Sequence, residues 1–105
     1  MKIAVTYENG QIFQHFGHTE QFKIYTVENG TIVSSEVIGA GGSGHGALAG
    51  LLEEQNVSVL ICGGIGGGAQ MALASAGIKL FGGVSGSCDE AVGALLANRL
   101  SFNPE

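Results

Sequence analysis

The stretch VLICGGIGGGAQMAL, residues 59–73, joins a short apolar run to a glycine-rich corner and then to a run with helical spacing. The nearly unbroken apolar run Val57–Cys62 is typical of a strand that is covered on both faces of a sheet. Gly68–Ala76 is predicted to be a helix, and Gly77 follows it where a left-handed cap is expected. A strand that passes directly into a helix indicates an α/β fold. The glycines in Gly63–Gly68 remove side chains from the corner, either for close packing of the chain or for a ligand.

A hairpin is predicted on the N-terminal side of this unit. Gln21–Val27 and Thr31–Ile38 are rich in β-forming residues, and the Asn29-Gly30 pair between them is the strongest short hairpin signal. These two strands are therefore expected to be antiparallel. Lys2–Tyr7 precedes them as a further short strand.

The C-terminal half continues the alternation of strands and helices. Ala47–Asn56 has leucines at helical spacing, and Lys79–Val84 forms the last strand. Ser87-Cys88-Asp89-Glu90 fits a capping box that opens a third helix, which extends to about Leu100. Right-handed crossovers then give an α/β fold with a mixed five-stranded sheet and three helices, in which strand two alone is antiparallel. Residues 1–105 are expected to form a single domain.

Four loops should open on one edge of this sheet. They are Glu8–Glu20, Gly39–Gly46, Gly63–Gly68 and Ser85–Ser87. All three helices begin there, so their unpaired N–H groups and positive dipole ends converge, which favours an anionic ligand.

Charge and composition exclude several classes of protein. Nine acidic residues against four basic ones give a net charge of −5, and the basic residues are scattered, so a nucleic-acid partner is not expected. The uncharged segment Gln55–Ile78 is interrupted by glycines and does not predict a membrane span. No signal-peptide pattern opens the chain, and two cysteines are too few for a secreted disulfide scaffold, so a cytoplasmic location is expected.

A nucleotide site is a weaker interpretation of the glycine loop. Gly64–Ala69 matches G-x-G-x-x-A after a strand and before a helix. The next strand, however, ends in Gly82–Gly86 without the acidic residue that binds ribose, and no G-K-S/T follows the loop. Tight turning and close helix packing are the structural alternative.

Metal-binding side chains fall in or beside the same loops. Cys62 ends a strand, Cys88 opens a helix, and His15, His18 and His45 lie in polar or glycine-rich segments. Either cysteine is equally consistent with a small buried core residue. Two cysteines cannot supply the four thiolates of an ordinary iron-sulfur centre, and zinc requires the loops to meet tetrahedrally. The set is better suited to a preformed anionic metal-sulfur cluster, held by one or two soft ligands and by backbone N–H donors.

No catalytic motif accompanies these residues. The chain contains no G-x-S-x-G, no H-E-x-x-H and no pair of acids at strand ends, so we expect a protein that is not an enzyme.

Four phrases together resemble the dinitrogenase iron-molybdenum cofactor biosynthesis family over nearly the whole chain: MKIAVTYENG, HFGHTEQFKIYTVENG, ICGGIGGGA and GVSGSCDEAV. The resemblance implies a ribonuclease H-like fold with strand two antiparallel. It implies non-covalent binding of an iron-molybdenum cluster, another molybdenum- or iron-sulfur cluster, or a precursor, with cluster donor and acceptor proteins as partners. The metal-ligand candidates are His15, His18, His45, Cys62 and Cys88, and the glycine candidates for contact with the cluster are Gly42, Gly44, Gly63, Gly64, Gly66, Gly67 and Gly68.

Two other functions stay open at the level of sequence. One is a small anion- or nucleotide-binding regulatory module that uses the same helix ends. The other is a protein-interaction domain whose loops hold no ligand.

Overall fold

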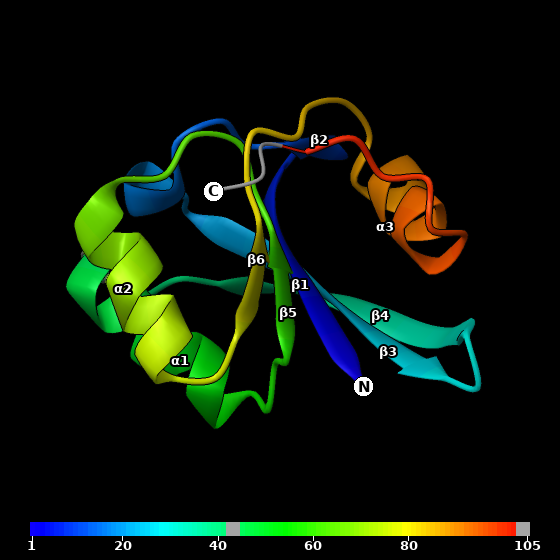
Figure 1. The fold of residues 1–105 in the computed structure, drawn as a ribbon, viewed down its shortest axis with the longest axis horizontal. Coiled ribbons are helices and arrows are strands. Elements are labelled where there is room, and N and C mark those ends of the chain that lie inside the picture. Colours follow the sequence, from blue (N-terminus) through cyan, green and yellow to red (C-terminus); the bar gives the residue numbers. More distant parts are fainter. Residues whose placement is uncertain (42–44, 103–105) are drawn as a thin grey trace.

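A mixed sheet with helices on both faces forms the protein (Figure 1). The computed structural model describes the backbone of residues 1–41 and 45–102. The strands are β1 (Lys2–Glu8), β2 (Gln11–Ile12), β3 (Gln21–Glu28), β4 (Thr31–Gly39), β5 (Val59–Ile61) and β6 (Lys79–Phe81). The helices are α1 (His45–Glu54), α2 (Gly67–Ser75) and α3 (Cys88–Leu96), with a 3-10 turn, η1, at Phe16–His18.

The order and direction of the strands confirm the predicted mixed sheet. Five strands follow the order β4-β3-β1-β5-β6, and β3 is antiparallel to both β1 and β4. β5 runs parallel to β1, and β6 runs parallel to β5. A sixth strand, β2, pairs only with β1 and was not predicted, because two residues are too few to show alternation.

The predicted hairpin between β3 and β4 is confirmed. Asn29 and Gly30 at its tip both have positive φ, 54° and 76°. This backbone conformation suits a two-residue turn between twisted strands, and it explains why Asn-Gly marks such a hairpin.

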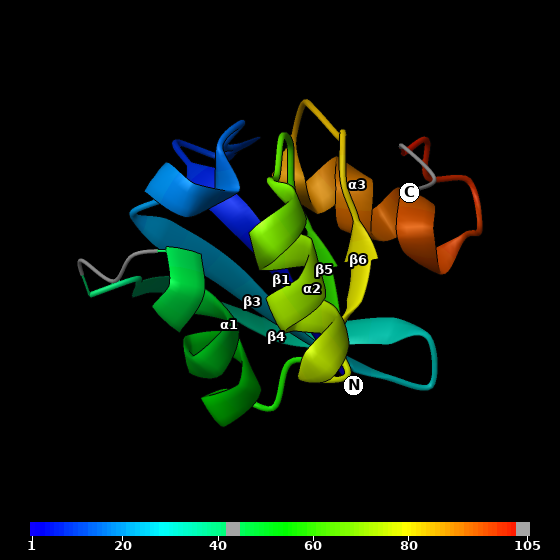
Figure 2. The same ribbon diagram turned by 60° about the vertical axis from the view of Figure 1, so that its left-hand side comes forward.

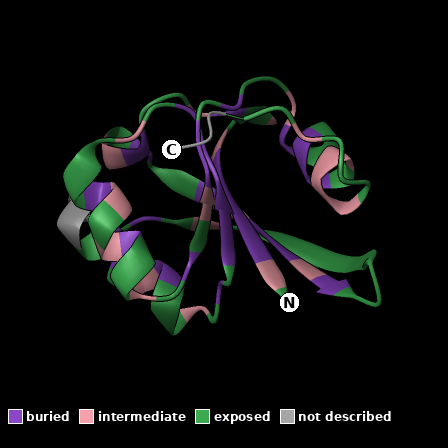
Figure 3. Cartoon of the chain, in the orientation of Figure 1, coloured by how far each residue is buried: buried purple, intermediate pink, exposed green. Residues whose placement is uncertain are grey.

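The two faces of the sheet carry different helices. Figures 1 and 2 show α1 and α2 together on one face and α3 on the other. Alternate residues of β1 serve the two faces: Ala4 packs in the cluster that includes Leu48 and Leu73, whereas Val5 packs in the cluster that includes Val92. Purple colouring in Figure 3 marks the central strands as buried, and β4 at the edge is mostly green.

Several elements end earlier than their hydrophobic pattern predicts. The α3 helix ends at Leu96 rather than about Leu100, since Asn98 takes a left-handed φ of 59°. The last strand stops at Phe81 instead of Val84, shortly before Gly83, which has a φ of 72°. An apolar run therefore predicts which residues are buried more accurately than it predicts the residue at which a helix or strand ends.

A polar network joins β3 to α3. Asp89 in the first turn of α3 accepts hydrogen bonds from Lys23 Nζ at 2.8 Å and from the Tyr25 hydroxyl. These two bonds lower the pKa of the Asp89 carboxyl, and burial together with the bond to Asp89 raises the pKa of Tyr25.

The carboxyl ends of β1, β4, β5 and β6 lie at one edge of the sheet, and each helix follows a strand that ends there. At the top of Figure 1, the segments after β1, β5 and β6 meet along this edge. Within residues 1–41 and 45–102, no helix is long and apolar enough to cross a membrane.

Candidate functional site

The segment that carries His15 lies directly against the glycine loop after β5. His15 and Gly64 form an isolated parallel bridge. Its hydrogen bonds run from Gly64 N to the Gln14 carbonyl at 2.7 Å and from Phe16 N to the Gly64 carbonyl at 3.0 Å. Two loops from different parts of the chain are thereby joined at the sheet edge.

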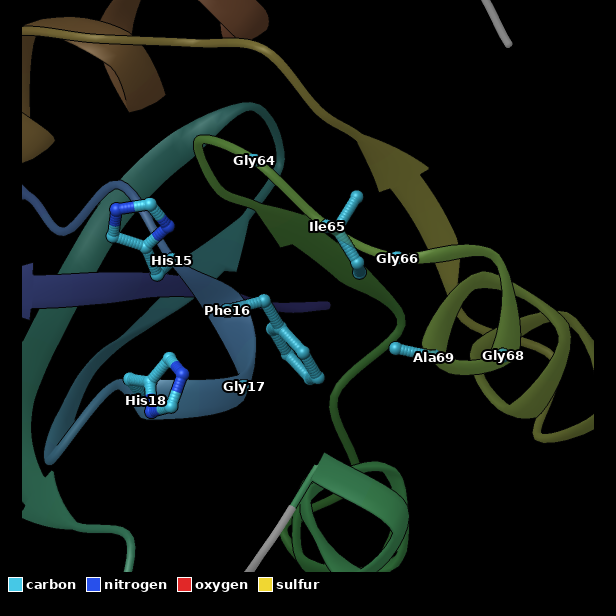
Figure 4. Close-up of a pocket in the computed structure, with 9 residues that line it drawn as sticks. All are labelled: His15, Phe16, Gly17, His18, Gly64, Ile65, Gly66, Gly68 and Ala69. Atoms are coloured by element: carbon cyan, nitrogen blue, oxygen red, sulfur yellow. The ribbon is translucent and has the colours of Figure 1, made fainter.

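A pocket of about 350 Å³ opens between these two segments (Figure 4). Phe16 and Ala69 are buried and form apolar surface in it, while the exposed His15 and His18 contribute two imidazoles. The two imidazole centroids are 6.4 Å apart. None of the residues that line the pocket carries a carboxylate; they are His15, Phe16, Gly17, His18, Gly64, Ile65, Gly66, Gly68 and Ala69.

Gly63 and Gly64 are glycines because the chain packs against them. A Cβ built on Gly63 would lie 2.7 Å from the backbone Cα of Gln14, a distance that side chains essentially never show. A Cβ on Gly64 would lie 3.1 Å from the Gln14 carbonyl oxygen. The close approach of the segment that carries Gln14 therefore explains why both positions are glycine.

No comparable packing contact within the described residues explains the glycines at positions 66–68. A Cβ added to any of them would meet no atom within 4 Å, and none has a φ in the left-handed region. All three are exposed. Neither packing nor turn geometry in residues 1–41 and 45–102 requires a glycine at these positions. Because they have no side chains, the backbone here is exposed on the outer surface.

The carbonyl oxygens of the glycine loop are all engaged by the protein. Each carbonyl from residue 62 to residue 66 accepts a hydrogen bond. The Cys62 carbonyl accepts from Val84 N (3.0 Å), that of Gly63 from Gly83 N (2.8 Å) and that of Gly64 from Phe16 N (3.0 Å). Gln70 donates to the last two, from Nε2 to the Ile65 carbonyl (3.2 Å) and from its main-chain N to the Gly66 carbonyl (3.0 Å). A peptide group is planar and no peptide here is cis, so holding the oxygen also sets the direction of the N–H that follows.

From Ile65 onward, the N–H groups of the same loop have no hydrogen-bond partner among the described residues. From Ile65 to Ala69 none donates a hydrogen bond to any residue that the structure describes. The N-cap of α2 is Gly66, which has no side chain to satisfy them, and no acidic residue lies in the first turn. Donors without acceptors at the positive end of a helix dipole favour an anion.

The start of α3 has the opposite character. Ser87 Oγ accepts a hydrogen bond from Glu90 N at 3.2 Å, which confirms the predicted serine cap. Cys88 N donates to the Gly10 carbonyl at 3.0 Å, and Asp89 and Glu90 place carboxylates in the first turn. At the start of α3, the Cys88 and Glu90 N–H groups have acceptors and two carboxylates disfavour an anion, whereas the start of α2 has neither feature among the described residues.

Both cysteines lie in the core, away from the histidine pair. Cys62 is fully buried on the face covered by α1 and α2, and burial raises the pKa of its thiol to about 12. Cys88 is buried on the face of α3, where its Sγ lies 3.6 Å from the Thr6 carbonyl. Burial and the neighbouring Asp89 raise the Cys88 pKa to about 11. Both thiols are core side chains, and neither lines the pocket that His15 and His18 line.

Other predicted residues fall at or beyond the limits of the described chain. Gly42 and Gly44 lie outside the described residues, and His45 is described only as the first backbone position of α1. Over the part of the chain that the structure does describe, no three His, Cys, Asp or Glu side chains gather closely enough to hold a metal ion. The described residues of the pocket present exposed backbone N–H groups and two imidazoles.

Two glutamines and a phenylalanine belong to the site without having been predicted. The main-chain carbonyl of Gln14 accepts a hydrogen bond from Gly64 N, the Gln70 side chain donates to the Ile65 carbonyl, and Phe16 forms part of the pocket wall. Phe16 lies between His15 and His18 in the sequence, and this position could have indicated that it belongs to the site. Nothing in the sequence distinguishes Gln14 from the other polar residues of its loop.

Comparisons with known proteins identify the family and the fold. A family model described as "Dinitrogenase iron-molybdenum cofactor" matches residues 1–98. MJ0580 of Methanocaldococcus jannaschii is 32% identical over 105 residues, covering 95% of this chain and 89% of MJ0580. The crystal structure of PH0822 has the same fold, with a TM-score of 0.92 at 23% identity over 100% of this chain and 96% of that one. The apo form of the orange protein from Desulfovibrio gigas gives a TM-score of 0.85 at 26% identity, covering 97% of this chain and 92% of that one. Because the family model spans almost the whole chain, this protein belongs to the dinitrogenase iron-molybdenum cofactor family.

Proposed function

We propose that this protein binds and carries, without catalysing a reaction, an anionic metal-sulfur cluster or its precursor during metallocofactor assembly. The cargo is an iron-molybdenum cluster or another molybdenum- or iron-sulfur species, and it is held in the pocket between η1 and α2. The observation that carries the proposal is the imbalance in the glycine loop: every carbonyl from residue 62 to residue 66 accepts a hydrogen bond, whereas the N–H groups of residues 65–69 donate none to the part of the chain that the structure describes.

The chemistry of the pocket fits such a cargo. Sulfide and oxo groups of an anionic cluster accept hydrogen bonds from backbone N–H groups. The imidazoles of His15 and His18 are suitable ligands for iron or copper, and they lie on the side of the pocket opposite Gly66. Apolar surface from Phe16 and Ala69 excludes water from the sulfide faces. The family membership and the likeness to a protein with an apo form support the same class of ligand.

Release is as important as binding in a carrier. The pocket offers imidazoles and peptide donors but no thiolate, because both cysteines are buried in the core. Both histidines are exposed, so a donor or acceptor protein can reach the cargo while it is bound. Such a site would exchange its cluster more readily than one built from several thiolates.

Titration of the protein with tetrathiomolybdate under argon tests the proposal. We expect a saturable change in the visible charge-transfer bands, at a fixed stoichiometry, and a cargo-dependent rise in the unfolding midpoint. Molybdate and sulfate at equal concentration are the matched oxyanion controls, and they should bind more weakly because they offer no sulfide. Absence of saturable uptake of both thiomolybdate and an iron-sulfur cluster would refute the proposal.

A regulatory module that binds a small anion or a nucleotide is the second candidate. The same unpaired donors favour it, because the start of α2 attracts any anion of suitable size. The residues after β6, Gly82-Gly83-Val84, supply no acidic partner for ribose, which counts against a dinucleotide. A rise in the unfolding midpoint with nucleotides but not with thiomolybdate would favour this candidate over the carrier.

A further inference from the structure

We infer that Gln14 is a positioning residue of this pocket: it joins the segment that carries His15 to the loops that follow β5 and β6. Its effect on cargo binding rests on the proposed function. Its effect on the geometry of the loops does not.

The Gln14 side chain uses both of its amide hydrogens on carbonyls from separate loops. Its Nε2 donates to the Ile12 carbonyl at 3.0 Å and to the Val84 carbonyl at 3.1 Å, across 70 positions of the chain. The Gln14 main-chain carbonyl accepts the bond from Gly64 N at 2.7 Å. Gln14 therefore contacts the end of β2, the glycine loop and the loop after β6.

Gly63 is the position that makes this arrangement possible. Any side chain there would collide with Gln14, since a Cβ would lie 2.7 Å from its Cα, Cδ and Oε1 atoms. The Gly63 carbonyl in turn accepts a bond from Gly83 N at 2.8 Å, which brings in the loop after β6 from the other side. Hydrogen bonds at Gln14, Gly63 and Gly64 thus connect the histidine segment, the glycine loop and the loop after β6, and we call this set of contacts the Gln14 seam.

Gln14 is an exposed residue that adjoins the pocket in the sequence without lining it. Gln14 is absent from the residues that line the pocket, but the next residue, His15, lines it, and so does Gly64 (Figure 4). Gln14 accordingly acts through these two neighbours: it holds one imidazole at a fixed position relative to the unpaired N–H groups of the loop. Loss of its amide removes the bonds to the Ile12 and Val84 carbonyls, so the histidine segment and the loop after β6 should move apart, and the backbone bonds to the glycine loop between them should weaken.

The test compares Gln14→Met with Gln11→Met. Methionine keeps the length of the side chain and removes the donor. Gln11 lies on β2, is exposed, and its side chain makes no hydrogen bond to any residue in the described ranges, so it is a matched control. Tetrathiomolybdate titration should show about tenfold weaker binding for Gln14→Met, the factor that 1.4 kcal/mol represents, and no change for Gln11→Met.

Amide hydrogen exchange without cargo separates positioning from a general loss of stability. In Gln14→Met we expect faster exchange confined to the Phe16, Gly64 and Gly83 amides, whose bonds cross the seam, with unchanged protection in the ladder between β1 and β3. Should the methionine variant fail to fold, Gln14→Asn, which keeps the amide but shortens its reach, makes the same prediction.

Each result decides a different claim. Equal affinity of wild type and Gln14→Met would overturn the inference while the proposed function stands. Weaker binding accompanied by uniformly faster exchange across the sheet would also overturn it, because it would show a purely structural role. If the wild type takes up no cluster, the proposed function fails, and the exchange pattern alone then decides whether Gln14 holds the three segments together.

Discussion

Substituting Gly68 by alanine should raise the stability of this protein and weaken its binding of cargo. Gly68 is the second residue of α2, has helical backbone, and leaves open space where a Cβ would stand. Alanine is favoured over glycine in a helix by up to about 1 kcal/mol, and near the helix start we expect about half of this or more. For a domain of this size that corresponds to a rise in the unfolding midpoint of about 2–4 °C.

The same methyl group should interfere with the ligand. Gly68 lines the pocket, and its N–H is one of the donors without a partner in the described chain. A hydrogen bond to a charged acceptor contributes about 1.5–3 kcal/mol, so preventing close approach at this donor should weaken binding about tenfold or more. The measurements are thermal unfolding without cargo and tetrathiomolybdate titration under argon.

Gly93→Ala provides the matched control. Gly93 lies inside α3 on the opposite face of the sheet, and a Cβ there also meets nothing within 4 Å. It should raise the unfolding midpoint without altering the dissociation constant. The reasoning is refuted if Gly68→Ala is stabilised but binds as tightly as wild type, because the exposed glycine backbone would then not be a contact surface.

Three further predictions concern other side chains. His15→Ala and His18→Ala should each shorten cargo retention on a desalting column by at least about threefold at unchanged stability; equal retention in both would leave backbone donors as the only contacts. Cys88→Ala should cost about 1 kcal/mol in urea unfolding, as for deletion of one buried methyl-sized group, and should leave uptake unchanged; a tenfold loss of affinity would show that the thiol reaches the cargo. Asp89→Asn should destabilise the protein at neutral pH by up to about 1 kcal/mol, because the carboxylate paired with Lys23 is mostly exposed. Since folding lowers the Asp89 pKa, this contribution is present above the unfolded value of about 4 and is lost as the pH falls through the folded value, so a difference between the two proteins that persists in acid would contradict the assignment.

Features encoded by neighbouring residues could be predicted from the sequence. The turn at Asn29-Gly30 needs only two residues that tolerate positive φ, and the start of α3 needs only Ser87 before the N–H of Glu90. The order of strands and helices then restricts the sheet to few topologies, because crossovers are right-handed. The mixed sheet and its common edge followed from these local signals.

Features that depend on distant contacts could not be predicted. The short β2 strand exists where Gln11 bridges to Ser87 and Ile12 N donates to the Gly86 carbonyl. The burial of Cys62 and Cys88 on opposite faces depends on which helix covers which side of the sheet. A sequence shows that a cysteine lies near a loop, but not whether its thiol points toward the loop or into the core.

The glycine loop shows why one motif can serve two purposes. Gly63 and Gly64 allow the close approach of the segment that carries Gln14, and the loop's carbonyls accept hydrogen bonds from other residues of the protein. Gly66–Gly68 leave the following N–H groups exposed and without a partner among the described residues. The first pair therefore fixes the direction of the peptide groups before any ligand arrives, and the second group provides access to them. Because its peptide groups are already oriented, the loop needs little reorganisation free energy when an anion binds. If that is how the loop works, Gly63→Ala should weaken cargo binding and destabilise the fold, because its Cβ would collide with Gln14, whereas Gly68→Ala should weaken binding while raising the unfolding midpoint. Unchanged cargo binding in Gly63→Ala, despite its lower stability, would contradict this account of the loop.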